Sequence, residues 1–566
     1  MTVLKKEIIL FLGISMSFCL SQAQDIEQVA KAKPLTVNGG INLNSGWYHI
    51  NDTSVKRDPF TWGINANLNF NVFGVIDVPF TLVYNKQDKS LGRPEYKNIG
   101  FSPKYKGYTL HVGYRNMQFS PYTYSGITFF GVGAEVAPEE SPVKFSGFYG
   151  RLNEAIPYNY ATGDLTNIKY RRRGWGSKVT IGKSKHIVDL IVFKAIDDIE
   201  TIIHPADSVD VKPEENIVIG INTTNKITER LSFRLEYARS ILSTDTRIDE
   251  KMGTQSSFIN QIDLFKPRTS TASHNAISGG LNYQGNSYTI GVSYKRVEPE
   301  YRSLGTSYST NDIEDWLINA SKSFFSNRIN LNGSLGKQRN DLARTKETKS
   351  IRTISSLNAS FTITKALNAS VNYSNFASNT SPSVISFTDS IKFIQTTSNI
   401  GANVNYNFGT DNYKHILSGS YNIQNANTLN QTGQEKVSNN TVVKSSFLTY
   451  GLTLVPLEMT INTSLNYTVF EQDSIQNKTI GPTIGTGRSF FKKRVQTNIS
   501  FSFLNQENAN NQTSKISVIT FSAGYRFWEN HSIMLSNAIS LREQMSGDIN
   551  KKVREIRGNI RYSYSF

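Results

Sequence analysis

Apolar and polar residues alternate along most of this chain. In the stretch "WGINANLNFNV", which runs from Trp62 to Val72, apolar side chains occupy nearly every second position and asparagines stand between them. The stretch "VQTNISFSF", which starts at Val495, repeats the pattern. A period of two residues places successive side chains on opposite faces of an extended chain. These segments are therefore predicted to be β-strands with one apolar and one polar face.

The links between the predicted strands alternate in length. Short links such as "FGVID", "GKSKH" and "WENH" take turns with longer ones such as "HINDTSVKRDP" and "DDIETIIHPADSVDVKPEEN". The strands of a soluble β-sandwich also have one apolar and one polar face, so the links decide between the two folds. Two-faced strands of about ten residues, with short turns at one end and long loops at the other, are typical of transmembrane barrels.

The sequence thus predicts an all-β fold, a single large antiparallel transmembrane β-barrel of about 26 strands, or 24 if a weak hairpin near residues 94–117 is misread. Short turns are expected in the periplasm, long loops are expected outside the cell, and an even strand count places both termini in the periplasm. Strands about 4.8 Å apart and tilted by about 40° would close at a diameter on the order of 50 Å. Side chains cannot fill a barrel of that width.

The start of the chain has the layout of a secretory signal peptide. Lys5 and Lys6 precede the apolar run "IILFLGISMSFCL", which leads into "SQAQ", so cleavage is predicted after Ala23. The expected division is a signal peptide over residues 1–23, a short periplasmic segment over 24–34 and the barrel over 35–566. Cys19 is the only cysteine and lies in the signal, so the mature chain is expected to contain no disulfide.

The net charge indicates which partners the chain meets. Removing Lys5, Lys6 and Glu7 with the signal changes the net charge from +16 to +15. A basic chain can bind nucleic acid, but an exported one meets anionic lipid and polysaccharide first. We therefore expect outer-membrane lipids and no nucleic acid among its partners. Residues 24–34 are too few for a plug domain, so occlusion is expected from the barrel's own loops or from a partner lipoprotein or secreted surface protein.

One predicted loop, "RNMQFSPYTYSG", is unusually apolar. Phe119, Tyr122 and Tyr124 are candidates for a constriction of the lumen or for the docking of a partner, because exposed apolar patches mark such sites. The alternative is a loop that packs on its neighbours at the barrel rim.

The segment "YRRRGWGSK" concentrates positive charge beside a predicted long loop. If Trp175 and Val179 face lipid, Arg172 and Lys178 face the lumen. Such a basic cluster in the lumen would favour anionic solutes. The alternative is that these side chains pair with loop carboxylates, as surface arginines commonly do.

The tryptophans are expected to form girdles at the two membrane interfaces, where indole rings are enriched. Four lie beside predicted long loops and one beside a short turn: Trp47, Trp62, Trp175 and Trp316, and then Trp528.

The sequence shows no pattern that would support catalysis or metal binding. The seven histidines include no pair at metal-ligand spacing on a common element, and no serine and histidine are placed to converge on one face with a polar orienting group. We therefore expect no catalytic residues, no metal, no cofactor and no enzymatic activity.

The signal ending in "SQAQD", the strands rich in Asn and Tyr, and the terminal Phe566 resemble outer-membrane β-barrel proteins of Bacteroidota. The block from "GFSPKYKGYTLHVGYRNMQFSPYTYSGITFFGVGAE" through "VDLIVFKAIDDIE" resembles a stretch of uncharacterised barrels of that group. The resemblance implies a location in the cell outer membrane. It also implies that the barrel-assembly machinery recognises the last strand, with Tyr562, Tyr564 and Phe566 as the signal.

Three predicted outer loops contain Asp-Ser followed by an aliphatic residue. This is similar to the O-glycosylation motif of Bacteroidota, with Ser208, Ser390 and Ser474 as the acceptors. The alternative is that so short a motif occurs by chance.

Together these features predict a wide outer-membrane channel or translocation pore, occluded by its own loops or by a partner lipoprotein or secreted surface protein. The alternative is a non-conducting scaffold that anchors surface adhesins or a secretion complex.

Overall fold

The computed structural model describes most of the chain after residue 32. The described ranges are 33–52, 57–86, 96–157, 168–202, 211–248, 264–307, 310–346, 348–382, 391–432, 435–473, 475–508, 513–546 and 549–566. The expected signal peptide and nearly all of the 24–34 segment lie outside these ranges, as do Ser208, Ser390 and Ser474.

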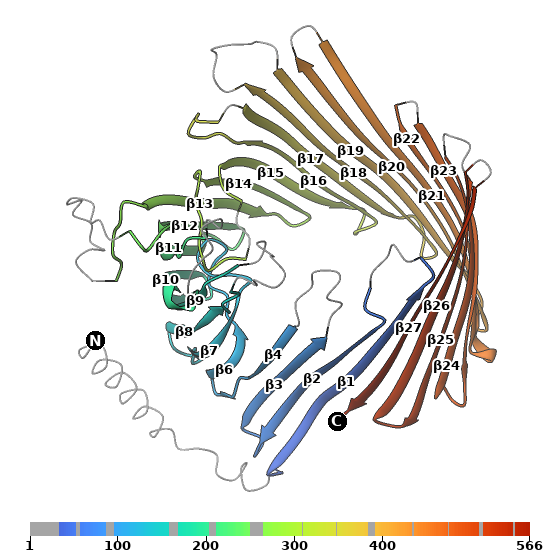
Figure 1. Cartoon of the computed structure of the whole chain (residues 1–566), viewed down its shortest axis with the longest axis horizontal. Helices are drawn as coiled ribbons and strands as arrows, with labels where there is room; N and C mark the ends of the chain where they lie inside the picture. The colour runs from blue at the N-terminus through green and yellow to red at the C-terminus, as the bar shows by residue number, and fades with distance from the viewer. Residues whose placement is uncertain are drawn as a thin grey trace.

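The described chain forms one closed antiparallel sheet (Figure 1). Each strand pairs with the strands that precede and follow it in the chain. The first strand, β1 (Leu35–Ile50), also pairs with the last, β27 (Ile549–Ser565), over a register from Gly40 opposite Ser565 to Ile50 opposite Glu555. This seam closes the wall, and the prediction of a single large antiparallel barrel is confirmed.

Twenty-seven strand segments make a wall of 26 strands, because two segments are pieces of one strand. Both β4 (Tyr96–Phe101) and β5 (Lys104–Tyr105) pair with β3 (Ile76–Lys86) on one side and with β6 (Tyr108–Asn116) on the other. The interruption falls at Pro103, which has no N–H to donate to the ladder. The weak hairpin near residues 94–117 therefore belongs to the wall.

The other elements follow in simple up-and-down order. They are β2 (Phe60–Val72), β7 (Thr128–Val136), β8 (Val143–Asn153), β9 (Arg171–Lys183), β10 (His186–Asp198), the 3₁₀ helix η2 (Ile199–Thr201), β11 (Glu215–Lys226), β12 (Leu231–Ser243), β13 (Thr271–Gln284), β14 (Tyr288–Val297), β15 (Ile313–Phe324), β16 (Ile329–Arg339), β17 (Thr348–Thr362), β18 (Leu367–Pro382), β19 (Ile391–Gly409), β20 (Tyr413–Thr432), β21 (Glu435–Leu454), the 3₁₀ helix η3 (Val455–Leu457), β22 (Met459–Gln472), β23 (Ile475–Phe490), β24 (Val495–Glu507), β25 (Thr513–Trp528) and β26 (His531–Ser546). Within the described ranges, no helix is long and apolar enough to cross a membrane.

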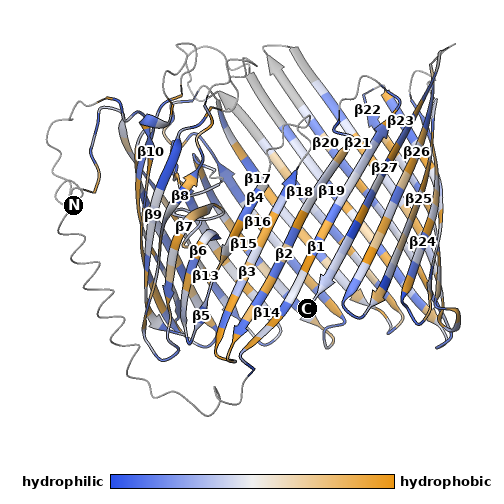
Figure 2. Cartoon of the chain, turned by 60° about the horizontal axis from the view of Figure 1, so that its bottom comes forward, coloured by the Kyte–Doolittle hydropathy of each residue, from blue (hydrophilic) through white to orange (hydrophobic). Residues whose placement is uncertain are grey.

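The wall has an apolar outer face and a polar inner face. In β19, Val404 and Tyr406 are exposed on one side, and Asn405 and Asn407 are exposed on the other. Figure 2 shows the same alternation of hydrophobic and hydrophilic positions along the tilted strands. Exposed apolar side chains on the outer face of other strands include Leu465, Ile484, Ile499, Phe521 and Leu541. Such a surface is suited to lipid rather than to water.

Both ends of the wall lie at the end of the barrel that carries the short turns. The N–H of Phe566 donates to the carbonyl oxygen of Gly39, 2.9 Å away, and the turn that follows Val72 lies beside Pro34, whose carbonyl accepts from the N–H of Phe73. The rings of Tyr564 and Phe566 are in contact, with centroids 4.6 Å apart.

The tryptophans lie at the two ends of the strands. Trp47, Trp62, Trp175 and Trp316 stand toward the long-loop ends of β1, β2, β9 and β15, and Trp528 is the last residue of β25, at the short-turn end. On the outer face, the ring of Trp62 lies 5.2 Å from that of Tyr84, and the ring of Trp316 lies 4.5 Å from that of Tyr294.

The barrel is not evenly round. In Figure 1, strands β6 to β13 curl into a compact lobe, whereas β15 to β27 form a long, gently curved wall. We call the first part the tight lobe and the rest the wide part. Two connections pack into the tight lobe: loop A, residues 117–127 between β6 and β7, and loop B between β14 and β15, described over residues 298–307 and 310–312.

Candidate functional site

Loop A lies inside the barrel. The hydroxyl of Ser120 donates to the carboxylate of Glu236 on β12, 2.5 Å away. Along the wall, β6 and β12 are six strand spacings apart, about 29 Å, but the four residues from Asn116 to Ser120 reach only about 14 Å. The wall must therefore curl back on itself, and loop A crosses on the concave side, which is the lumen.

The aromatic residues of loop A pack against the inner face of the wall. Tyr124 is fully buried, with its ring centroid 4.3 Å from that of Phe148 on β8 and 5.5 Å from that of Phe193 on β10. Phe119 is also buried, 5.8 Å from both Tyr124 and Phe148. The structure thus places these two candidates within the tight lobe as part of a hydrophobic core inside the barrel.

Glycines of the wall make room for this core. An ideal Cβ built on Gly176 of β9 would lie 2.6 Å from the ring of Phe119 and 2.7 Å from that of Phe148. A Cβ on Gly305 of loop B would lie 2.8 Å from the ring of Phe193. Only glycine allows such close approach. The glycines at alternate positions of β7 and β9 are thus the sequence signal for an inner layer, and sequence reasoning did not use it.

Loop B docks onto loop A. The two loops form a parallel β-bridge between Ser125 and Thr306. The N–H of Ser125 donates to the carbonyl oxygen of Gly305 at 2.9 Å. The hydroxyl of Ser303 donates to the carbonyl oxygen of Thr123 at 2.6 Å. The third candidate, Tyr122, packs edge-on against the fully buried Tyr301, with centroids 6.2 Å apart. Loops A and B therefore form one insertion.

A buried amide fastens this insertion to the wall. Asn216 of β11 is fully buried, and its side-chain NH₂ donates to the hydroxyl of Ser240 at 2.8 Å. Its carbonyl oxygen accepts from the N–H of Leu304 at 3.0 Å. The Ser240 hydroxyl in turn donates to the carbonyl oxygen of Arg302 at 2.6 Å. Each of these polar groups thus has a hydrogen-bond partner. A buried polar group without such a partner would destabilise the fold.

Charged groups close the network at the long-loop end. Arg172 donates to both oxygens of Asp197 at 2.7 and 2.9 Å, and to Glu214 at 3.0 Å. Arg302 of loop B forms a second ion pair with Glu214. Burial lowers the pKa of Arg302. The charge of Arg172 is thus balanced by carboxylates and is not presented alone to the lumen.

The two candidates of the basic cluster are not brought together. The ammonium of Lys178 lies 5.6 Å from the ring centroid of Phe119, so Lys178 does face the lumen. It stands six residues after Arg172 on the same strand, about 20 Å away along the chain. The two-residue period correctly predicted that Arg172 and Lys178 face the same side of β9. It did not predict that they are too far apart to form one site.

Burial also affects the phenols of the insertion. The pKa values of Tyr124 and Tyr301 are raised well above their usual range because both rings are buried and an ionised phenol would lose its hydration. Both hydroxyls remain neutral donors at ordinary pH. They bind the carbonyl oxygens of Ile127 at 2.8 Å and of Tyr122 at 2.7 Å.

Sequence reasoning missed one serine, histidine and glutamate arrangement at the other end of the lobe. The hydroxyl of Ser102 lies 2.9 Å from Nδ1 of His111, and Nε2 of His111 lies 3.5 Å from Glu135. A hydrolase needs an accessible nucleophile and free oxyanion donors. Ser102 is only 6% exposed, and its N–H already donates to the carbonyl oxygen of Pro79. The arrangement therefore holds the interrupted strand β4–β5 against β6 and β7.

Metal-binding clusters are not found in the described ranges, where no three His, Cys, Asp or Glu side chains are grouped to hold an ion.

The wide part of the barrel has a different lining. Amide side chains that are exposed on its inner face include Asn405, Asn407, Asn462, Gln496 and Asn498. The outer residues of the same strands are exposed as well, so neither face of these strands is covered by another part of the described chain. In this region the wall is a single layer with a polar inner surface.

No model of a known protein family matches the chain, and no curated protein matches it in sequence. Among solved structures, the chain is similar to the P pilus usher PapC translocation pore, with 9% identity, a TM-score of 0.35, and coverage of 94% of this chain and 99% of that one. It is also similar to the ferric enterobactin receptor PfeA of Pseudomonas aeruginosa (9%, 0.40, 94% and 81%) and to OccAB2 of Acinetobacter baumannii (11%, 0.30, 94% and 98%). Values at this level assign no family, so the function has to be argued from the barrel itself.

Proposed function

We propose that this chain is an outer-membrane channel or translocation pore whose passage lies in the wide part of the barrel. One observation carries the proposal: loops A and B fill the tight lobe with buried side chains, whereas the polar inner face of the wide part is uncovered by the described chain. A wall of this size cannot be filled by its own side chains. The loops thus close one side of the lumen and leave a passage beside them.

The outer face and the closed wall support a location in the outer membrane. A closed barrel leaves no backbone edge unpaired in lipid, and its exposed apolar band matches the hydrocarbon core. We place the short turns and both termini in the periplasm and the long loops outside the cell. Tyr562, Tyr564 and Phe566 then lie on the last strand, where the barrel-assembly machinery would read them. Deletion of Phe566 should lower the amount of assembled barrel.

In the cell, we propose that a partner lipoprotein or secreted surface protein occupies the passage that the loops leave. An uncovered polar channel of this width would otherwise make the membrane permeable to small solutes. Affinity purification from native membranes in mild detergent should then retain such a partner, whereas the barrel stripped of it should conduct.

Single-channel conductance tests the proposal. The purified barrel should conduct, and deletion of residues 118–125 should raise the conductance because it unblocks the tight lobe. A milder variant, Phe119→Ser with Tyr124→Ser, should raise it in the same direction. Folding of each variant is checked by heat-modifiable mobility in gels. A folded wild-type barrel that carries no current would overturn the channel and favour the scaffold. A folded deletion variant with unchanged current would overturn the role of the loops.

A further inference from the structure

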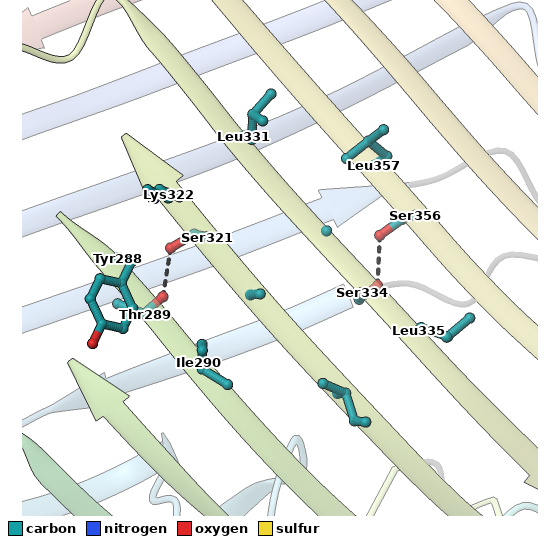
Figure 3. Close-up of a pocket in the computed structure, with 13 residues that line it drawn as sticks. Tyr288, Thr289, Ile290, Ser321, Lys322, Leu331, Ser334, Leu335, Ser356 and Leu357 are labelled. Carbon is teal, nitrogen blue, oxygen red and sulfur yellow. Dashed lines mark hydrogen bonds between the residues drawn. The ribbon is translucent and has the colours of Figure 1, made fainter. Parts of the chain in front are cut away.

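A groove with a volume of about 650 Å³ lies on the outer face of β14 to β17, near the short-turn end (Figure 3). This volume is within the roughly 300–1,000 Å³ of small-molecule sites. Its lining includes the aliphatic side chains of Ile290, Ile318, Leu331, Leu335 and Leu357. On the opposite face of the same strands, the hydroxyls of Thr289 and Ser321 lie 2.5 Å apart, and those of Ser334 and Ser356 lie 2.7 Å apart. Because these hydroxyl pairs face the lumen, the groove on the opposite face of the strands faces lipid.

Two small residues, Ala320 and Gly333, form the floor of the groove. An ideal Cβ on Gly333 would lie 3.5 Å from the carbonyl oxygen of Ser356 and 3.6 Å from Leu357, which are ordinary contact distances. The backbone therefore does not require glycine here. The groove results from the absence of side chains, and a larger residue could fill it without disturbing the ladder.

The groove ends in positive charge at the membrane edge. Lys322 follows Ala320 on the same face of β15, lies opposite Tyr288 in the register, and carries its ammonium 4.8 Å from the ring centroid of Phe324. At the same end, Arg230 donates to the side chain of Asn286 at 3.1 Å. A lysine near a strand end extends its charge to the interface and keeps its stem in the apolar layer.

We propose that this groove holds an acyl chain of an anionic glycerophospholipid from the leaflet at the short-turn end, with its phosphate against Lys322 and Tyr288. The proposal rests on the membrane location argued above. Bulk lipid accommodates an acyl chain as well as an apolar groove does, so the groove adds only packing. Selection of this lipid over its neighbours comes from the charge at the rim, where each basic residue attracts anionic lipid.

Binding of defined lipids to the full barrel in mild detergent tests the site, with phosphatidylglycerol and phosphatidylethanolamine as probes and native mass spectrometry as the readout. The wild type should prefer phosphatidylglycerol, and Lys322→Gln should weaken that binding about fivefold, which corresponds to one basic residue near anionic lipid. Ala320→Leu should weaken the binding of both lipids because it fills the groove. The matched controls are Lys492→Gln in the turn between β23 and β24, and Ala402→Leu on the outer face of β19.

Equal losses in the variants and their controls, or no preference for phosphatidylglycerol, would overturn the proposal. Retention of a lipoprotein acyl chain in place of phospholipid would overturn it too. A barrel that conducts without this preference contradicts the lipid site alone. A barrel that shows the preference but carries no current contradicts the channel alone.

Discussion

The hydroxyl of Tyr301 donates a hydrogen bond of 2.7 Å to the main-chain carbonyl of Tyr122, although the two residues stand 179 positions apart in the sequence. Loop A leaves the wall between β6 and β7 and loop B leaves it between β14 and β15, so this bond joins two separate parts of the wall. Because Tyr301 is fully buried, the bond links loops A and B more firmly than an exposed bond would.

Replacing Tyr301 with Phe should loosen the insertion. The ring stays, but the carbonyl of Tyr122 loses its donor in a buried place, which costs about 1–3 kcal/mol. Hydrogen exchange of the loop A amides should therefore accelerate by about 5- to 150-fold. Tyr421→Phe, on the exposed outer face of β20, should have no effect. Equal exchange in Tyr301→Phe and the wild type would show that the bond does not hold the loops together.

Strong alkali should release the insertion reversibly. Burial holds the pKa of Tyr124 and Tyr301 above the ordinary value of about 10, whereas the released loops would ionise near that value. The stability from these phenols is fully present below about pH 10 and falls as the pH rises toward the folded-state pKa. Conductance should thus increase above about pH 10 and return on neutralisation. The double variant Tyr124→Phe, Tyr301→Phe should show a weaker response to alkali, and an identical response would assign the opening to other groups.

Neutralising Arg172 should damage the lobe, whereas neutralising Lys178 should not. Arg172→Gln leaves the carboxylates of Asp197 and Glu214 short of a cation, and breaking a buried pair costs about 3–5 kcal/mol. Lys178 lies over the ring of Phe119 and forms no ion pair within the described ranges, so Lys178→Gln is the matched control. The fraction of heat-modifiable barrel should fall in the first variant alone. An equal yield of both would mean that the ion pairs contribute little.

The seam should be sensitive at Gly558. A Cβ there would lie 1.9 Å from the indole of Trp47 on the first strand, so Gly558→Val must displace the ring at an overpacking cost of about 1–3 kcal/mol. Gly419 has no atom within 4 Å of its ideal Cβ, which makes Gly419→Val the control. Melting of the folded band in heated gels should begin at a lower temperature for Gly558→Val only. If both variants melt with the wild type, the indole does not pack tightly at the seam.

The wall could be predicted from the sequence because its rule is local. Alternation with a period of two residues, as in the stretch from Trp62 to Val72, indicates which face of a strand meets water. The alternating lengths of the links indicate the up-and-down topology. Even the interrupted strand at Pro103 fell within the predicted strand count.

The interior could not be predicted in the same way. Whether Phe119 and Tyr124 pack at the rim or in the lumen depends on how sharply distant strands curl, and no local pattern records that curvature. The contacts of loop A with Glu236 and Tyr301 join positions far apart in the chain. The clue that was present, glycine at alternate positions such as Gly174 and Gly176, marks a surface approached closely by other side chains.

The pairing of β1 with β27 also sets the order of events during biogenesis. The side chain of Asn559 donates across the seam to the carbonyl oxygen of Ser45, 514 positions away in the sequence, so closure of the wall needs both ends of the chain. Until the final strand is delivered, the sheet has two free edges and cannot enclose anything. If the barrel inserts into the outer membrane as proposed, a chain that lacks β27 would therefore leave an open sheet whose two edges have unpaired backbone groups.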